Sequence, residues 1–478
     1  MKQVTALTST YSSDQFGICS ALYELGGMVV MHDASGCNST YTTHDEPRWY
    51  SRESMIYISA LSEVEAVTGD DEKLIRDIVE TAEELKPAFI AVVGGPIPYM
   101  TGTDFRAVAS LIEKRTGIPS FGFEADGMQG YLTGVSMALE AVVKRFCRES
   151  EAGFPERKDN IRACGKGKEA GSRDGGWAEE KYHPSRQSAA YPGEPSAGQR
   201  NRDPMKKNFS AQQGGEKNSS GSLSGEKKKK VNIVGATPLD IPLNGTLESI
   251  RGWLEESGFE PGACLAMGSS LEEIAQAGSA QANLVVSYGG MAAAREMERR
   301  FGIPWTAGVP VGKKFAAELA GELRKTAGTG ESRVGYTGDS SGEGKTDGSA
   351  RYLRNDEGKK WKFEKRNFSS SLVFIGESIF GGSLARAVEL EAGRRVRVFC
   401  PLETEDRFLR EGDHRTPEED DLLVHLKGAG GVIADPLYRP LCPEGTLFYP
   451  LPHTAFSGRM YEGQRPNLIG RKLNFLKK

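Results

Sequence analysis

Residues 71–93, DEKLIRDIVETAEELKPAFIAVV, contain the pattern that decides the fold class of this chain. Apolar side chains recur with helical period from Leu74 onward, and Asp71 can cap the start of that helix. Pro87 ends the helical pattern. Residues 88–93 are then apolar throughout, which is typical of a strand in a parallel sheet that helices cover on both faces.

The same alternation of helices and strands continues along the chain. Further helical or strand patterns lie at 104–114, 118–123, 130–145, 231–234, 246–257, 284–287, 291–300, 371–375, 383–391 and 396–399. Regular alternation predicts an α/β fold of three Rossmann-like domains, each built on a parallel sheet. In such domains, ligands bind at the carboxyl ends of the strands.

Two segments interrupt this alternation. Residues 156–230 are dominated by Gly, Ser, Lys, Arg, Glu and Asn, and residues 326–362 have the same character. Segments of this composition cannot bury enough apolar surface to offset the entropy lost on ordering. We therefore expect a disordered linker at 156–230 and a flexible insert at 326–362, between domains at 1–155, 231–325 and 363–478.

Composition and charge limit the classes of protein to which this chain can belong. The 478 residues carry a net charge of −4 and are 38% hydrophobic, which is enough for ordinary cores. No basic excess points to a nucleic-acid partner. The sequence shows no signal-type N-terminus and no run of about 20 apolar residues, so we expect no membrane segment and a cytoplasmic location. Seven unevenly spread cysteines favour reduced thiols or metal ligation over a disulfide framework.

Nucleotide binding at the strand ends is not indicated by the sequence. No Gly-x-Gly-x-x-Gly follows a predicted strand, and no Gly-x-x-x-x-Gly-Lys-Ser/Thr occurs in the chain. Residues 94–96, Gly-Gly-Pro, and residues 376–378, Gly-Glu-Ser, are interpreted as turns that leave strands.

Two cysteines near the N-terminus are the strongest candidates for chemistry. Cys19 lies in FGICS and Cys37 in HDASGCNS, and a glycine precedes each by one or two residues in a loop-like context. The intervening residues 21–31 are mostly small and apolar, so both thiols can flank one buried element and share a site. The spacing alone leaves two interpretations open, which are metal ligation and structural burial.

Motifs from Cys19 to about Tyr461 resemble the nitrogenase component 1 family. In that family a His-x-x-x-Gly-Cys segment carries a cluster cysteine, and His32 to Cys37 has this form. The other matching stretches are YTTHDEPRWY (41–50), MIYISALSE (55–63), GDDEKL (69–74), VNIVG (231–235), SLEEI (270–274) and ERRFGIPW (298–305).

The resemblance implies a four-iron four-sulfur cluster shared between two subunits, with Cys19 and Cys37 as the ligands from this chain. The family's third cluster cysteine falls at Gly95 or Pro96, so this chain lacks it. A cuboidal cluster normally takes four cysteine ligands, so a partner subunit is expected to supply the other two. His32 is close to Cys37 in sequence and is a candidate for tuning the cluster, or simply for capping a turn.

True nitrogenases of this family also hold an iron-molybdenum cofactor through a cysteine and a histidine. The cysteine position corresponds to Ser287, whose hydroxyl is a poor ligand for a soft iron-sulfur site, and the histidine position to His453. Dinitrogen reduction on such a cofactor is therefore not expected. His453 and Arg459 are expected to face the cleft between domains and to contact an anionic substrate or cofactor. The remaining cysteines with apolar surroundings are expected in cores: Cys147, Cys264, Cys400 and Cys442.

Together these features predict a subunit of the catalytic component of a nitrogenase-like reductase. The resemblance implies that an ATP-dependent iron protein supplies electrons, which pass through the shared cluster to a substrate or metallocofactor. The partner subunit is either a second copy or a related component 1-like chain. Two other interpretations remain open, namely a cofactor-assembly scaffold of the same family without turnover, and a non-redox binding subunit whose cysteines are merely buried.

Overall fold

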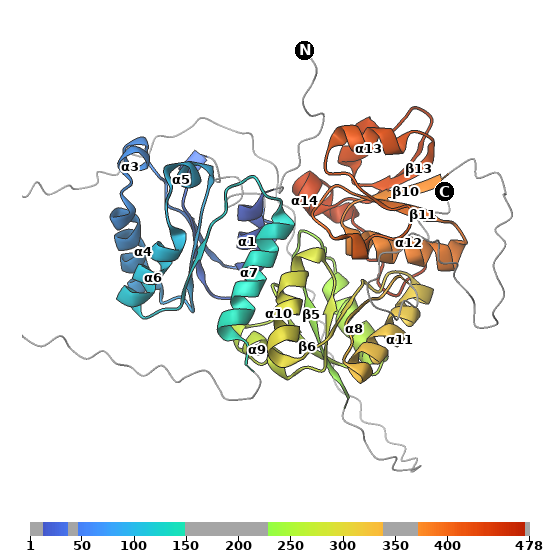
Figure 1. The fold of residues 1–478 in the computed structure, drawn as a ribbon, viewed down its shortest axis with the longest axis horizontal. Coiled ribbons are helices and arrows are strands. Elements are labelled where there is room, and N and C mark those ends of the chain that lie inside the picture. The colour runs from blue at the N-terminus through green and yellow to red at the C-terminus, as the bar shows by residue number, and fades with distance from the viewer. Residues whose placement is uncertain (1–12, 37–45, 149–227, 338–370, 474–478) are drawn as a thin grey trace, which may run out of the picture. The chain divides into compact units, whose positions relative to one another are not determined.

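The computed structural model describes residues 13–36, 46–148, 228–337 and 371–473 (Figure 1). Within these residues the strands form three sheets, and every pairing between named strands is parallel. The predicted α/β fold with three parallel sheets is therefore confirmed. Cys37 and most of the two predicted inserts lie outside the described residues. None of the described helices is long and apolar enough to cross a membrane.

The N-terminal sheet is covered by helices on both faces. Its elements are α1 (Asp14–Leu22), β1 (Met28–Met31), β2 (Met55–Ile58), α3 (Glu63–Thr68), α4 (Asp71–Leu85), β3 (Ile90–Val93), α5 (Pro96–Thr101), α6 (Phe105–Thr116), β4 (Ser120–Phe123) and α7 (Tyr131–Phe146). The strand order is β2-β1-β3-β4. Alternate strand residues face two different apolar clusters, one against α1 and α7 and the other against α4 and α6 (Figure 1).

The middle sheet has the strand order β6-β5-β7-β8-β9. Its elements are β5 (Lys230–Val234), α8 (Thr246–Glu256), β6 (Glu260–Cys264), α9 (Leu271–Ala275), η2 (Ala277–Ser279), β7 (Ala282–Val285), η3 (Tyr288–Gly290), α10 (Met291–Phe301), β8 (Trp305–Ala307), α11 (Lys313–Thr329) and β9 (Arg333–Val334). α11 and β9 extend into the range predicted as the second insert. The helix continues there because Thr326 is buried, with its hydroxyl 2.8 Å from Thr306 Oγ1.

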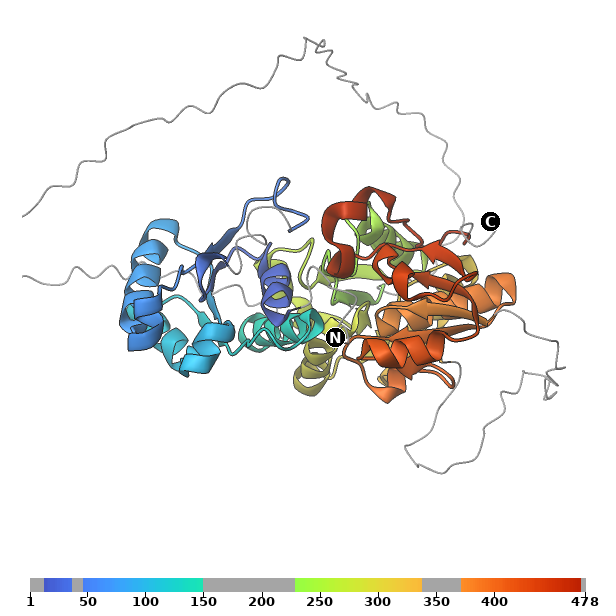
Figure 2. The same ribbon diagram turned by 90° about the horizontal axis from the view of Figure 1, so that it is seen from above.

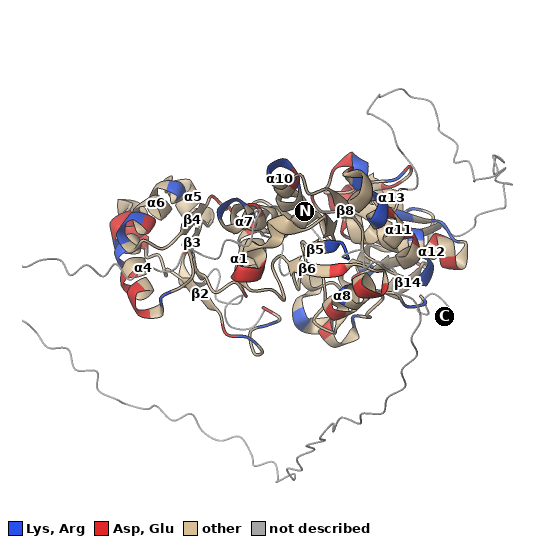
Figure 3. Ribbon diagram, turned by 90° about the horizontal axis from the view of Figure 1, so that it is seen from below, with Lys and Arg blue, Asp and Glu red and all other residues tan. Residues whose placement is uncertain are grey.

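The C-terminal sheet has the strand order β12-β11-β10-β13-β14. Its elements are β10 (Ser371–Ile375), α12 (Ser378–Ala392), β11 (Val396–Cys400), η4 (Asp406–Phe408), β12 (His414–Arg415), α13 (Glu419–Leu426), β13 (Ala429–Ala434), η5 (Pro436–Leu441), β14 (Leu447–Pro450), α14 (Thr454–Ser457) and η6 (Gly458–Gln464). Figure 3 shows acidic and basic residues interspersed over the helices of the fold.

Capping side chains decide where two helices begin. Asp70 rather than Asp71 caps α4, because its carboxylate accepts a hydrogen bond from the Lys73 backbone N–H at 3.1 Å. α12 begins at Ser378, five residues before the predicted start, because Glu377 caps it. The Glu377 carboxylate accepts from the backbone N–H groups of Ile379 and Phe380, two first-turn donors that have no partner within the helix.

The helix that carries Cys19 crosses α7 at direct backbone contact. A Cβ atom on Gly17 would lie 2.0 Å from the Tyr131 carbonyl oxygen, and one on Gly134 would lie 1.9 Å from the Asp14 carbonyl oxygen. The glycine before Cys19 therefore serves a helix crossing and not a loop, which corrects the loop-like interpretation of this segment. Only glycine permits so close an approach.

α7 in turn connects the N-terminal sheet to the middle sheet. It packs against α10 and η3 as well as against α1. Figures 1 and 2 show α7 beside the N-terminal sheet on one side and beside the elements of the middle sheet on the other. The position of Cys19 is therefore fixed relative to both sheets through one helix.

Replacing Gly17 by alanine should lower the free energy of unfolding by about 1–3 kcal/mol, because the added methyl group forces α1 away from α7. Urea unfolding of the purified variant measures this change. Gly321→Ala in α11 is the matched control, since a Cβ atom there has nothing within 4 Å. The control should be neutral or stabilising by up to about 1 kcal/mol. Equal stability of wild type and Gly17→Ala would show that the crossing is loose.

Candidate functional site

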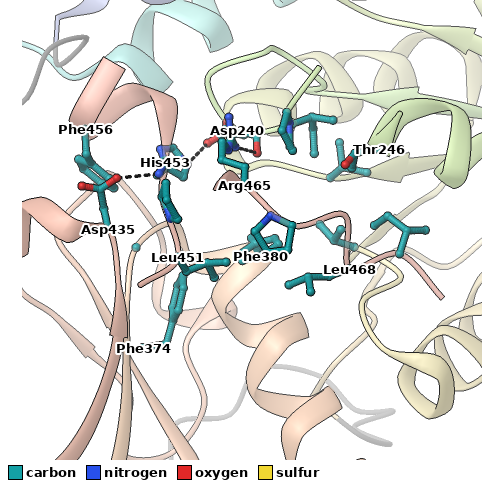
Figure 4. A pocket seen from close by; sticks show the side chains of 18 of the residues that line it. Asp240, Thr246, Phe374, Phe380, Asp435, Leu451, His453, Phe456, Arg465 and Leu468 are labelled. Atoms are coloured by element: carbon teal, nitrogen blue, oxygen red, sulfur yellow. Dashed lines mark hydrogen bonds and ion pairs between the residues drawn. The ribbon is translucent and has the colours of Figure 1, made fainter. Parts of the chain in front are cut away.

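A buried cleft lies where strands of the middle and C-terminal sheets end. Its lining includes residues that follow the carboxyl ends of β5, β7, β10, β13 and β14 (Figure 4). The cavity at its base measures about 50 Å³ and has mostly apolar walls with a few polar groups. Such strand-end clefts are where ligands of parallel α/β proteins bind.

Asp240 is the centre of the polar groups in this cleft. Its carboxylate accepts hydrogen bonds from Tyr131 Oη at 2.6 Å, from Ser287 Oγ at 2.6 Å and from His453 Nε2 at 3.1 Å. These donors come from all three sheet units. Burial by itself raises the pKa of Asp240, but the hydrogen bonds from its three partners outweigh burial, so the pKa is lower than its ordinary value.

Asp435 sets the orientation of His453. One oxygen of the Asp435 carboxylate accepts from the His453 backbone N–H and from Ser457 Oγ, both at 2.7 Å. The His453 ring Nδ1 accepts from the Ala455 backbone N–H at 3.3 Å, which assigns the ring proton to Nε2. The imidazole therefore donates to Asp240 through Nε2 and has no free nitrogen for another group.

Glu377 is a second buried carboxylate near Asp240, and only 1% of it is exposed. It accepts hydrogen bonds from the backbone N–H groups of Ile379, Phe380 and Tyr288 at 3.0, 2.7 and 3.0 Å. Burial and the negative charge of Asp240 raise the pKa of Glu377 to about 7, against the opposing effect of these hydrogen bonds. Glu377 thus joins α12 to η3 at the edge of the cleft.

Arg465, and not the predicted Arg459, is the arginine of the cleft (Figure 4). Arg465 is 8% exposed and donates to the Asp240 backbone carbonyl at 2.9 Å and to Thr454 Oγ1. The Arg459 guanidinium lies over the Tyr50 ring, 5.7 Å from its centroid. The prediction that His453 faces the cleft is consistent with its place in the lining, whereas Arg459 is not part of that lining.

The residues present do not fit an iron-molybdenum-type cofactor. Ser287 and His453, the two positions that correspond to its protein ligands, do lie together, but both bind Asp240. A hydroxyl is a poor ligand for a soft iron site, and the imidazole nitrogen that faces the cleft already donates to a carboxylate. A cavity of about 50 Å³ leaves room for only a few water molecules. The cavity admits a molecule of only a few atoms.

Cys19 is the described member of the predicted cluster-ligand pair. It is fully buried in α1, within the apolar cluster between α1 and α7. Burial, together with the negative charge of Glu46, raises the pKa of the Cys19 thiol well above its ordinary value. The side chain is thus a soft donor in a dry site, which a bound cation would stabilise as a thiolate. Cys37 lies outside the described residues.

Two polar side chains fill the space at Gly95, which is one of the two positions, with Pro96, predicted to correspond to the family's third cysteine. A Cβ atom on Gly95 would lie 2.4 Å from Asp33 Oδ2 and 2.8 Å from Gln15 Nε2. Gln15 lies one helical turn before Cys19 and donates to the Gly94 carbonyl at 2.6 Å. A side chain at residue 95 would therefore overlap Asp33 and Gln15.

His32 and Cys19 lie on opposite faces of the N-terminal sheet. His32 packs edge-on against Phe105 of α6 at a centroid distance of 6.1 Å, and its Nδ1 lies 2.9 Å from Ser59 Oγ. Cys19 packs in the cluster on the α1 and α7 face. Strand alternation separates the two residues although they are close in sequence, so the structure does not bring His32 to the Cys19 thiol.

The other cysteines lie in apolar surroundings within the described residues. Cys147, Cys264 and Cys400 are buried, and Cys442 is partly exposed against the C-terminal cluster. Burial raises the pKa of Cys264 to about 12, which is typical of an inert structural thiol.

Sequence reasoning missed Asp240, Tyr131 and Glu377. Asp240 and Glu377 each follow the end of a predicted strand, at 231–234 and 371–375, and a polar residue in that place is the signal that could have found them. Tyr131 had no such signal, because its role depends on the crossing of α7 with α1.

The family model of nitrogenase component 1 type oxidoreductases matches residues 19–337, and the chain belongs to this family. Among solved structures, the chain is similar to one titled "Nitrogenase Cp1 at pH 5", with 15% identity, a TM-score of 0.53 and coverage of 95% of this chain and 85% of that chain. It is also similar to "Nitrogenase Cp1 at pH 6.5", with 14% identity, a TM-score of 0.51 and coverage of 95% and 86%. At this identity the likeness shows the fold alone. No curated protein matches the chain.

Gly95→Ala should lower the free energy of unfolding by about 1–3 kcal/mol, because the methyl group displaces the buried Asp33 and Gln15 side chains. Thermal unfolding measures the loss. Gly252→Ala in α8, where a Cβ atom meets nothing within 4 Å, is the control. A Gly95→Ala protein as stable as that control would mean that the Asp33 and Gln15 side chains move aside at no cost.

Glu377 should make the protein less stable as pH rises from about 4.5 to 7. Its folded-state pKa is raised to about 7 from an ordinary value of 4.5, so the unfolded chain loses its proton first and is favoured across that window. Relative to Glu377→Gln, the wild type should lose on the order of 2 kcal/mol between these limits. Urea unfolding at several pH values tests this, with exposed Glu80→Gln as the charge control. Parallel profiles for wild type and Glu377→Gln would contradict it.

Proposed function

We propose that this chain is a subunit of the catalytic component of a nitrogenase-like reductase. It holds a four-iron four-sulfur cluster between two subunits through Cys19 and Cys37, and an ATP-dependent iron protein supplies the electrons. Membership of the component 1 type oxidoreductase family supports this class of function. The structural observation that best supports it is the position of Cys19. This cysteine is buried in α1, which packs in direct backbone contact with α7, the helix that begins at the cleft.

The donor chemistry at Cys19 supports an iron-sulfur site. A cluster of this type is held by thiolates and, when bound, stores and passes single electrons. Cys19 offers a soft sulfur in a fully buried position. Nearby, Arg48 donates to Glu46 at 2.7 Å and to the Ser20 carbonyl at 2.8 Å, which fixes the segment that follows Cys37 in the chain against α1.

α7 provides the structural connection from Cys19 to the cleft. Tyr131 is the first residue of α7, its carbonyl contacts α1 at Gly17, and its hydroxyl donates to Asp240. The Gly130 backbone N–H, at the same helix end, donates to Glu403 Oε1 of the C-terminal unit at 2.7 Å. α7 would thus hold the proposed cluster at Cys19 and the ligand site in the cleft at a fixed distance and orientation.

An apolar surface on the N-terminal unit supports a partner subunit. Large apolar side chains are exposed on α3 and α5, which contact each other, and on the loop after β4. These residues are Val64, Val67, Tyr99, Met100 and Met128. They lie past the carboxyl ends of β2, β3 and β4, the end at which β1 leads toward Cys37. A second component 1 subunit, either a copy of this chain or a related chain, would cover this surface and supply the remaining cluster ligands.

In the cleft, the chain's own groups would bind a substrate and not a resident metallocofactor. Asp240 stays ionised because three donors hold its charge, and the buried Arg465 donates to its backbone carbonyl. The cleft therefore has fixed hydrogen-bonding groups within apolar walls, and its cavity of about 50 Å³ would admit a substrate of only a few atoms.

Cys19→Ala and Cys37→Ala should each abolish the paramagnetic signal of the reduced, anaerobically purified dimer and weaken subunit association, because each removes one of two ligands from the chain. Iron and sulfide analysis accompanies the spectra. Cys264→Ala is the matched control, since Cys264 is equally buried but lies in the middle unit. A full signal in either cluster variant would reject the assignment.

Turnover must also be separated from cofactor assembly. Mixing the cluster-loaded protein with its iron protein and ATP should give reduction of the cluster that depends on ATP hydrolysis. Transfer of iron to a second protein without such reduction would support the scaffold instead, and a protein that binds no iron would support the non-redox subunit.

A further inference from the structure

A second cavity, of about 300 Å³, lies in the N-terminal unit between the edge strand β2 and helix α4. It is on the face of the sheet that is opposite to Cys19, and therefore separate from the site described above. Its size is at the lower end of the range for small-molecule sites.

The body of this cavity is apolar. The parallel register of β1 and β2 places Met28 beside Met55 and Val30 beside Tyr57 on the same face of the sheet. Leu74 and Ile78 of α4 form the opposite wall. Tyr57 is 40% exposed, because β2 is the edge strand and no further helix covers it among the described residues. A flat apolar group would gain contact on both sides in this space.

The next pair of residues in the same register forms a polar end. His32 is 6% exposed, and its Nδ1 lies 2.9 Å from Ser59 Oγ. Among the described residues its Nε2 has no hydrogen-bond partner, and His32 lines the cavity. Burial lowers the pKa of His32, so the ring is neutral at pH 7 and one of its nitrogens is an acceptor.

The charged groups around this polar end are mostly acidic. Glu65, Asp70 and Asp77 line the cavity together with one cation, Lys73. Lys73 Nζ lies 3.0 Å from a carboxylate oxygen of Glu65 and 3.0 Å from one of Asp77, so its charge is already paired. The excess of carboxylates favours a cationic guest over an anionic one.

We propose that this cavity binds a small organic ammonium ion with an apolar, preferably aromatic, body. The ammonium group would donate to His32 and lie among the acidic side chains, while the ring would lie between the sheet residues and α4 beside Tyr57. The proposal does not depend on the proposed reductase function, because it uses neither Cys19 nor the Asp240 cleft.

Titration of the full-length protein with 2-phenylethylammonium, followed by ligand-observed NMR at pH 7.5, tests the proposal. Saturable binding with a dissociation constant on the order of 1 mM or below is expected for a ligand of this size. Phenylacetate has the same body and the opposite charge, and it should bind at least about tenfold more weakly. Equal or tighter binding of phenylacetate, or no saturable binding of the amine, would overturn the proposal.

Two variants locate the site. Asp70→Asn with Asp77→Asn removes two charges while asparagine still caps α4, and it should weaken amine binding by about fivefold or more. Thr81→Phe, at the rim on α4, should fill the apolar end and compete with the ring. Glu272→Gln with Asp406→Asn, both exposed and in other units, is the matched charge control and should leave binding unchanged. Binding that survives both test variants would place the ligand elsewhere and reject the site.

Discussion

The buried carboxylate of Asp240 is the interaction on which the arrangement of the three α/β units depends. It is held by Tyr131 from the N-terminal unit, Ser287 from the middle unit and His453 from the C-terminal unit. A buried charge is tolerated only when donors surround it, and these donors reach Asp240 only when all three units are in place. The same hydrogen bonds therefore fix both the geometry of the cleft and the packing of the three units.

A second constraint acts on the N-terminal side of the same centre. α1 and α7 cross with backbone against backbone, so neither helix can slide without a clash. α7 begins with Tyr131, whose hydroxyl donates to Asp240. Any shift of α1 would therefore also move a group that binds Asp240 in the cleft. Glu403 caps the same helix end from the C-terminal unit and strengthens this connection. These contacts fix the distance between α1 and the cleft, and electron transfer between two sites requires such a fixed distance.

Much of the fold was predictable from the sequence, because helical period and buried strands are local signals. The helix after Asp70, the strand ending at Val93 and the helix starting near Met291 lie within one or two residues of their predicted places. The packing of α1 was not predictable, since the glycine two residues before Cys19 looks the same whether it serves a loop or a helix crossing.

The site was predictable only in part, because its contacts join residues that are far apart in the sequence. Ser287 and His453 could be placed together from the resemblance, and in the structure both donate to the Asp240 carboxylate. The residue that joins them, Asp240, is distant in sequence from both, and no local pattern links the three. His32 is close to Cys37 in sequence, but strand alternation places its side chain on the face of the sheet opposite to Cys19.

Gly95 limits which single amino-acid substitutions this chain can accept at that position. Gln15 and Asp33 occupy the volume into which a cysteine side chain would have to enter, and Gln15 also satisfies the Gly94 carbonyl. A single substitution back to cysteine would therefore meet filled space before it could meet a metal. The Asp33 and Gln15 side chains would have to move or become smaller, and moving Gln15 would remove its hydrogen bond to the Gly94 carbonyl. A cysteine at residue 95 is thus hard to reach along any path of single amino-acid changes.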